Sequence, residues 1–194
     1  MVIVCVMVRA MYSRSRYAMC YDAFIFSSTK GPEPLAKVGH SVSSFLCKIG
    51  RSKKPGKLVN ALAFGSYNKK ISHPKTIFDW LSTDEHEVTK YVEDPLCGFY
   101  FTNKGFQDLL SIILWNQNPD AKIGYCKKPC LFTYGDQDPV TGYGKGVKKV
   151  INEMKAMGID VTDVEFKSYR HELMNDFCRN DYFAAVLDFL ENKA

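Results

Sequence analysis

The sequence Pro129-Cys-Leu-Phe-Thr-Tyr-Gly-Asp-Gln-Asp-Pro-Val140 begins the part of the chain that decides the fold class. Its first six residues are an apolar run that ends in turn residues, which is typical of a buried strand in a parallel sheet. The pattern then predicts an amphipathic helix over 142–157, a strand over 161–169 and an amphipathic helix over 181–190. Strand, helix, strand and helix in this order indicate a parallel sheet with crossover helices, so we expect an α/β fold.

One more strand and a long helical region are predicted upstream. Residues 23–27 (AFIFS) form another short apolar run followed by turn residues, typical of a buried strand. From about residue 36 to residue 125 the pattern is helical and loop-like. The segment Ser82-Thr-Asp-Glu85 has the spacing of a capping box, and it predicts a helix that ends before Asp94-Pro95. A further helix with one apolar face is predicted over 105–116.

Length and composition fit one ordinary globular domain. The chain has 194 residues, of which 46% are hydrophobic and 24% charged, so we expect a packed core rather than disorder. The formal net charge is +5. A nucleic-acid-binding protein usually concentrates its positive charge on one stripe or motif, whereas the densest basic run here, residues 48–57 (KIGRSKKPGK), sits among Gly, Ser and Pro. We interpret this run as a solvated loop and expect no nucleic-acid partner.

Cysteines and apolar runs indicate the cellular compartment. The seven cysteines are odd in number and scattered, so they do not form a disulfide framework. Cys126 and Cys130 are four residues apart but lack two further ligands for a zinc site, and we expect no cofactor. The N-terminal run of eight apolar residues has no basic segment before it, so we interpret it as a buried helix or strand and not as a signal peptide. No stretch approaches the roughly 20 apolar residues of a transmembrane helix, and we expect a cytoplasmic protein with reduced thiols.

Two ionisable residues follow consecutive strands of the predicted sheet. Asp138 lies on the loop after strand 129–134, and His171 lies on the loop after the next strand, 33 residues later. A carboxylate in this position can orient an imidazole, as the acid and base of a serine-hydrolase triad require. Asp138 is a better candidate than Asp136, because Pro139 fixes the backbone directly after it. The alternatives are a simple turn rich in Asp and Gly and a structural histidine.

Several segments in the same order resemble a known family. These are the run from Lys57 onward (KLVNALAFGSYNKKI), Phe78-Asp-Trp-Leu-Ser82, Asp94-Pro-Leu-Cys-Gly-Phe99 and the Gly-Asp-Gln-Asp-Pro-Val segment. Together they resemble the serine aminopeptidase-like branch of the α/β-hydrolases, which includes monoacylglycerol lipases and lysophospholipases. The resemblance covers roughly residues 20–194. It implies the C-terminal part of an α/β-hydrolase fold, with about three parallel strands, crossover helices and a helical cap.

The resemblance also implies a division of the chain and a function. Residues 1–29 correspond to a remnant helix and strand of the hydrolase core, 30–125 to the helical cap, and 126–194 to the C-terminal core. Asp138 and His171 fall on the acid and base of the family, and the implied substrate is an acyl ester or a lipid-like small molecule. The apolar residues of 99–115 line an acyl-chain pocket or fill the core of the cap, and the sequence leaves both readings open.

A convincing nucleophile is missing from this pattern. The nearest match to the G-x-S-x-G elbow is Gly39-His-Ser41-Val-Ser43, but an elbow needs a strand directly before it. Pro32, Pro34 and Lys37 break the approach, so we expect Ser41 on the first helix of the cap. Cys5 is the other candidate nucleophile, a thiol, but no glycine flanks it as in an elbow.

Three hypotheses follow. The first is a hydrolase-family chain that is inactive alone, because it lacks the elbow and the oxyanion loop. The second is a non-catalytic remnant or interaction module that complements a separate N-terminal half, since strand 23–27 would otherwise expose an apolar edge. The third is an active hydrolase that uses Ser41.

The glycine-rich segment Gly142-Tyr-Gly-Lys-Gly146 is a separate feature. We interpret it as the approach to a helix and not as a phosphate loop.

Overall fold

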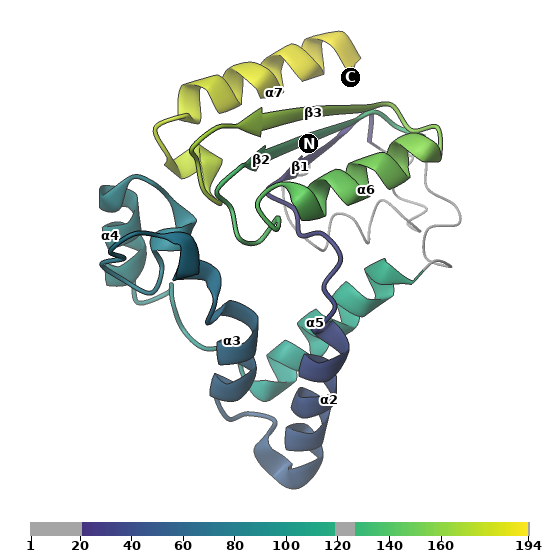
Figure 1. The fold of residues 1–194 in the computed structure, drawn as a ribbon. Coiled ribbons are helices and arrows are strands. Elements are labelled where there is room, and N and C mark those ends of the chain that lie inside the picture. The colour runs from purple at the N-terminus through teal and green to yellow at the C-terminus, as the bar shows by residue number, and fades with distance from the viewer. Residues whose placement is uncertain (1–20, 119–126, 194) are drawn as a thin grey trace.

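The computed structural model describes residues 21–118 and 127–193. The expectations for Cys5, Cys126 and the N-terminal apolar run lie outside the described residues, and so does most of the first predicted domain, 1–29. Three parallel strands form one sheet in the order β1-β2-β3 (Figure 1). They are β1 (Phe24–Ser27), β2 (Cys130–Gly135) and β3 (Val161–Phe166). The pairing aligns Phe24 with Cys130 and Cys130 with Val161, and it confirms the predicted parallel sheet.

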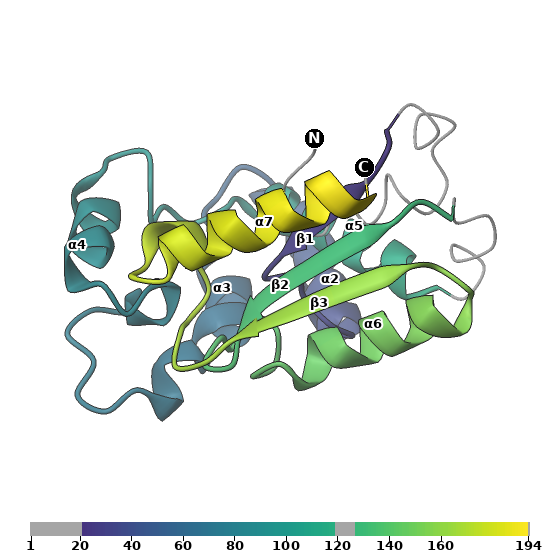
Figure 2. The ribbon, with the colours of Figure 1, turned by 90° about the horizontal axis from the view of Figure 1, so that it is seen from above.

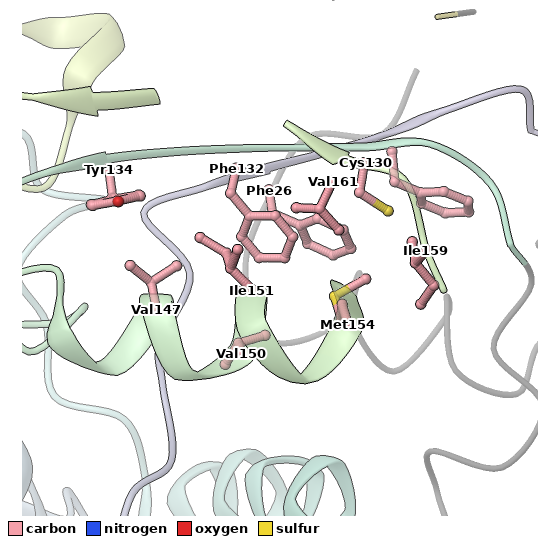
Figure 3. Packing of buried hydrophobic residues seen from close by; sticks show 11 residues of the cluster. Phe26, Cys130, Phe132, Tyr134, Val147, Val150, Ile151, Met154, Ile159 and Val161 are labelled. Carbon is pink, nitrogen blue, oxygen red and sulfur yellow. The ribbon is translucent and has the colours of Figure 1, made fainter. Parts of the chain in front are cut away.

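The side chains of the strands alternate between two covered faces. On one face Phe24, Phe26, Phe132 and Tyr134 pack against helix α6 (Lys145–Ala156), as Figure 3 shows for the labelled members of this cluster. On the other face lies α7 (Arg179–Lys193), and Figure 2 shows it running across the sheet on the side away from α6. Its buried residues pack against Ile25, Leu131 and Phe166, and they are Tyr182, Val186 and Phe189. A parallel sheet covered by helices on both faces is stable for this reason.

Helix α6 begins three residues later than the sequence pattern predicts. The backbone torsion φ is positive at Gly142, Tyr143 and Gly144, with values of 67°, 57° and 76°. This left-handed turn is incompatible with a right-handed helix, so the first helical residue is Lys145. The glycine-rich segment is thus the approach to a helix, as predicted. Strand β3 also ends earlier than predicted, at Phe166, and Ser168 again has a positive φ of 68°.

A helical layer, defined here as residues 36–117, lies beside the sheet (Figure 1). Its longer helices are α2 (Ala36–Leu46), α3 (Lys57–Phe64), α4 (Glu85–Glu93) and α5 (Asn103–Gln117). They alternate with the short helical turns η2 (Cys47–Arg51), η3 (Tyr67–Lys70) and η4 (Asp79–Leu81). The core of the layer is formed by α2, α3 and α5 and contains Ala36, Val59, Phe106, Leu110 and Ile113. One last turn, η6 (Leu173–Asn175), precedes α7.

The predicted capping box is wrong, although the helix predicted to follow it is present. Helix α4 begins at Glu85, and its N-cap is Asp84, whose carboxylate accepts a hydrogen bond from the amide of His86. The hydroxyl of Ser82 instead donates to the carbonyl of Asn175 at 2.8 Å and accepts from the amide of Asp84 at 3.0 Å. Both Ser and Asp are good N-caps, and here Asp84 takes the position.

Within residues 21–118 and 127–193, no helix has the length and apolar character needed to cross a membrane.

Replacing Phe132, which is fully buried between β2 and α6, tests this packing. Phe132→Ala should lower the free energy of unfolding by about 3–5 kcal/mol, because it removes a buried ring and leaves a cavity. The matched control is Phe177→Ala, at a position that is 71% exposed, where a change of less than about 0.5 kcal/mol is expected. Urea unfolding followed by circular dichroism measures both. Similar losses in the two variants would contradict the described core.

Candidate active site

Asp138 is held in a tight turn directly after β2. Its side chain is fully buried, and one carboxylate oxygen, Oδ1, accepts a hydrogen bond from the amide of Val140 at 2.8 Å. Its own carbonyl accepts from the hydroxyl of Thr141 at 3.0 Å and from the amide of Tyr143 at 2.8 Å. These bonds leave Oδ2 as the oxygen available to a partner across the sheet edge. A buried carboxylate is stable only when it is hydrogen-bonded in this way.

His171 supplies that partner from the loop after β3. The Nδ1 atom of the imidazole lies 3.0 Å from Oδ2 of Asp138, so the structure brings together the two residues that the sequence pattern singled out. The imidazole side chain is 25% exposed. Because Nδ1 faces the buried carboxylate, Nε2 is the ring nitrogen left to meet another group. Asp138 and not Asp136 takes this role, since Asp136 instead accepts from the amide of Ser168 at 2.7 Å.

Bulky side chains are excluded where the two loops meet. A Cβ atom on Gly135 would lie 2.2 Å from the carbonyl oxygen of Tyr169 and 2.4 Å from that of Arg170. Only glycine permits this approach of the end of β2 to the loop that carries His171. The amide of Gln137 donates to the Tyr169 carbonyl at 3.0 Å and holds the two loops together.

The loop around His171 is also anchored to β1 and to the helical layer. The hydroxyl of Ser28, just after β1, donates to the carbonyl of His171 at 2.6 Å. The guanidinium of Arg170 donates to the carbonyls of Asp79 and Ser82, at 2.7 Å each, and the amide of Glu172 donates to the carbonyl of Leu81 at 2.7 Å. The segment that carries the imidazole is therefore held by partners from two parts of the chain, Ser28 and residues 79–82.

A cavity of about 220 Å³ opens next to His171. Most of its wall is apolar and comes from α2, α3 and α5, including Gly39, Val59, Phe106, Leu110 and Ile113. Trp80 also lines it, with its ring centroid 5.4 Å from that of His171. Of residues 99–115, Phe106, Leu110 and Ile113 fill the core of the layer and also line this cavity.

Three polar residues stand together in the cavity wall. The ammonium of Lys30 lies 2.7 Å from the Glu33 carboxylate and 2.9 Å from the hydroxyl of Tyr67. Burial by itself lowers the pKa of Lys30, but the neighbouring Tyr67 phenol and Glu33 carboxylate outweigh it and raise this pKa above its usual value. The lysine is therefore charged and neutralised by its partner, so the wall offers hydrogen-bonding groups without a net charge.

Ser41 lies in the second turn of α2, as expected, and its side chain is exposed. Gly39, two residues earlier, lines the cavity. Successive residues of an α-helix are about 100° apart, so Ser41 lies about 200° around the helix from Gly39. The structure therefore does not bring Ser41 into the cavity wall with His171. Ser28 is close to His171, but its hydroxyl is bonded to the backbone of His171.

The part of the chain that the structure describes contains no group of three or more His, Cys, Asp or Glu side chains that could hold a metal ion.

A carboxylate–imidazole pair on the loops after two adjacent parallel strands, beside a cavity under a helical layer, defines an α/β-hydrolase fold, of which this chain contains a part. A family model described as serine aminopeptidase, S33, matches residues 7–177. The chain therefore belongs to the serine aminopeptidase S33 family, and the resemblance noted in the sequence is confirmed.

Solved structures show the same fold. A thermostable carboxyl esterase from Bacillus coagulans has a TM-score of 0.84 at 23% identity, over 98% of this chain and 64% of the esterase. A monoglyceride lipase from Saccharomyces cerevisiae has a TM-score of 0.67 at 14% identity, over 96% of this chain and 58% of the lipase. The monoacylglycerol lipase of Paleococcus ferrophilus has a TM-score of 0.62 at 18% identity, over 97% and 67%. This chain thus spans less than two thirds of the length of that esterase. Comparison with curated proteins found no match.

Sequence reasoning missed the residues that position the pair. Trp80 packs beside the imidazole, Arg170 bonds to backbone carbonyls, and Gly135 permits the close approach of two loops. None of these contacts produces a recognisable spacing of residues in the sequence. One signal was available for Gly135, because a glycine that ends a buried strand often marks a close backbone contact.

Substituting Asp138 tests the hydrogen bond to His171. A carboxylate only accepts hydrogen bonds, so neutral His171 carries its proton on Nδ1. In Asp138→Asn the amide can donate to Nδ1, which favours the other tautomer, with the proton on Nε2. Long-range ¹H–¹⁵N NMR of the imidazole distinguishes the two. Asp136→Asn is the control and should leave the tautomer unchanged. An unchanged tautomer in Asp138→Asn would contradict the pairing.

Gly135→Ala tests the close approach of the two loops. We expect a loss of about 1–3 kcal/mol in the free energy of unfolding, because the added methyl group overpacks against two backbone carbonyls. The His171 imidazole resonances should also shift, since its loop must move. Gly105→Ala in α5 is the matched control, because its Cβ would lie 3.5 Å or more from its nearest neighbours, Phe101 and Thr102, and a helical alanine is favoured over glycine. Unfolding curves and NMR spectra that are alike in both variants would exclude this role of Gly135.

Proposed function

We propose that this chain is the acid- and base-bearing part of an acyl ester hydrolase of the monoacylglycerol lipase or lysophospholipase type. The observation that carries the proposal is the 3.0 Å contact between Asp138 and His171, with the other side of the imidazole next to an apolar cavity. In this proposal residues 126–194 form the C-terminal part of the core and 30–125 form a cap over the site. The family, together with relatives named as esterase and monoacylglycerol lipases, supports this class of substrate.

The roles follow from the geometry. A serine hydroxyl attacks the acyl carbonyl, and Nε2 of His171 accepts the hydroxyl proton as the bond forms. Asp138 keeps the imidazole in the required tautomer and stabilises the imidazolium. His171 then gives the proton to the departing alcohol, and the acyl-enzyme is hydrolysed in a second cycle with water as the attacking group.

The sequence contains no recognisable nucleophile elbow. None of its 194 residues lies in a G-x-S-x-G motif, and Ser41 lies on the outer side of α2. We propose that a separate N-terminal half supplies the serine elbow and the oxyanion-hole donors, and that this chain alone does not complete the reaction.

The cavity suits the acyl part of the substrate. Its wall is mainly aliphatic and aromatic, and burial of each methylene group contributes roughly 0.8 kcal/mol. A cavity of about 150 Å³ is already large enough for benzene, so about 220 Å³ accommodates an acyl chain of medium length. The neutral group formed by Lys30, Glu33 and Tyr67 offers hydrogen bonds to the oxygen atoms of an ester or a glycerol.

Fluorophosphonate labelling of the chain alone tests the missing nucleophile. Read by intact mass and peptide mapping, it should give no adduct on Ser41, because this serine does not lie in the cavity wall with His171. A circular-dichroism spectrum of the same sample confirms that the chain is folded. An adduct on Ser41 that disappears in His171→Ala would make Ser41 the nucleophile and contradict the proposal.

Co-expression with an N-terminal α/β-hydrolase fragment that carries a G-x-S-x-G elbow tests the base itself. The assembled protein should hydrolyse p-nitrophenyl butyrate, and His171→Gln should lower kcat by at least about a thousandfold. His86→Gln is the matched control, because His86 is exposed on α4, and it should leave kcat unchanged. An assembled enzyme with equal rates in both variants would contradict the role of His171.

A further inference from the structure

Positive charge is concentrated in one part of the helical layer. Residues 34–78 contain no Asp or Glu but nine Lys and Arg side chains. The formal charge of this segment is therefore +9, and the other 149 residues carry −4. Five of the nine cations fall within residues 48–57, and they form no ion pair with a described residue; they are Lys48, Arg51, Lys53, Lys54 and Lys57.

Exposed apolar side chains occupy the same part of the layer. Leu35, Val38 and Phe45, at the N-cap of α2 and along it, are three and seven residues apart, which places them on one side of the helix. Ile49 follows in η2. The exposed fractions of these four side chains lie between 52% and 61%. Leu58 and Leu62, four residues apart on α3, are likewise exposed, at 58% and 49%. Large exposed apolar patches usually mark a binding surface.

An aromatic loop joins this surface to the basic run. The amide of Gly56 donates to the carbonyl of Phe101 at 2.8 Å, and the amide of Asn103 donates to the carbonyl of Lys54 at 3.0 Å. The ammonium of Lys57 lies 6.0 Å from the ring centroid of Tyr100. Cations and exposed rings are thus held in one surface, at the connection between α2 and α3, which is the end of the helical layer far from the sheet (Figure 1).

We propose that this end of the helical layer docks on an anionic lipid surface. Interfacial binding sites combine Lys and Arg with exposed aliphatic and aromatic side chains, so that the cations meet anionic headgroups while the apolar groups enter the acyl boundary. The acid-free segment provides the charge complementarity, and the stripe of α2 with Leu58 and Leu62 provides the apolar part. A nucleic acid would use the cations and leave the aliphatic stripe uncovered.

The position of the cavity fits this surface. Leu35 and Leu62 are exposed members of the apolar stripe, and both also line the cavity next to His171. A lipid surface that covers the stripe therefore lies at the mouth of the cavity. The docking inference rests on charge and exposure alone, so it stands or falls independently of the proposed function.

Vesicle flotation of the full chain tests the proposal. We expect binding to vesicles of phosphatidylcholine with 30% phosphatidylglycerol, little binding to phosphatidylcholine alone, and release at about 0.5 M NaCl, where charges are screened within a few ångströms. The variant Lys53→Gln/Lys54→Gln/Lys57→Gln should bind at least about tenfold more weakly. The matched control Lys127→Gln/Lys145→Gln/Lys149→Gln removes the same charge from exposed positions outside the surface and should bind like the parent chain.

A second variant separates lipid from other partners. Phe45→Ser/Ile49→Ser keeps every cation, and it should also lose vesicle binding while its circular-dichroism spectrum stays that of the parent. Equal binding to neutral vesicles, or equal losses in the two lysine variants, would overturn the proposal. Two other results would also overturn it. One is a DNA duplex that binds Phe45→Ser/Ile49→Ser as well as the parent chain and displaces vesicles from the parent. The other is a dimer, detected by sedimentation, that buries this surface against a second copy.

Discussion

Strand β2 is buried along its whole length, and the need to cover both of its faces determines the arrangement around it. Its odd and even residues point to opposite sides, so one helix on one face would leave half of its side chains in water. Helices α6 and α7 supply the two covers. Parallel pairing with β1 and β3 then directs the carboxyl ends of all three strands to one edge. Ser28, Asp138 and His171 follow those three ends, and hydrogen bonds to His171 bring them together there.

Much of this arrangement could be predicted from residue patterns. Apolar runs that end in turn residues correctly located β1 and β2, because a strand covered on both faces is mostly apolar. The third predicted strand, β3, is also present, although it contains Thr162, Asp163 and Glu165 and is less buried. The Asp138–His171 pair was found from chain order, since loops after adjacent parallel strands lie at the same edge of the sheet. Pro139 also separated Asp138 from Asp136 correctly. These are local or topological properties, and they do not depend on how the rest of the chain packs.

Other features depend on contacts between distant segments, and no local pattern contains them. Helix α4 is capped by Asp84, and Ser82, the first residue of the predicted capping box, donates its hydroxyl to the distant carbonyl of Asn175. The basic run 48–57 was correctly interpreted as solvent-exposed, but its significance emerges only when the loop containing Tyr100 and Phe101 is placed against it. The same is true of Lys30, whose partner Tyr67 lies 37 residues away in the chain. The surroundings of these charged residues therefore depend on contacts that exist only in the folded chain.

The bonds between the His171 loop and the helical layer have a thermodynamic consequence. Arg170 and Glu172, on either side of the imidazole, donate to the carbonyls of Asp79, Ser82 and Leu81. Any displacement of that segment must be transmitted to the imidazole or must break these bonds. Binding of a ligand against the helical layer and the orientation of the His171 imidazole are thus linked by one coupling free energy, which acts equally in both directions. Because the acceptors are backbone carbonyls, the linkage does not depend on which side chains occupy residues 79–82, and it can persist while that segment diverges in evolution.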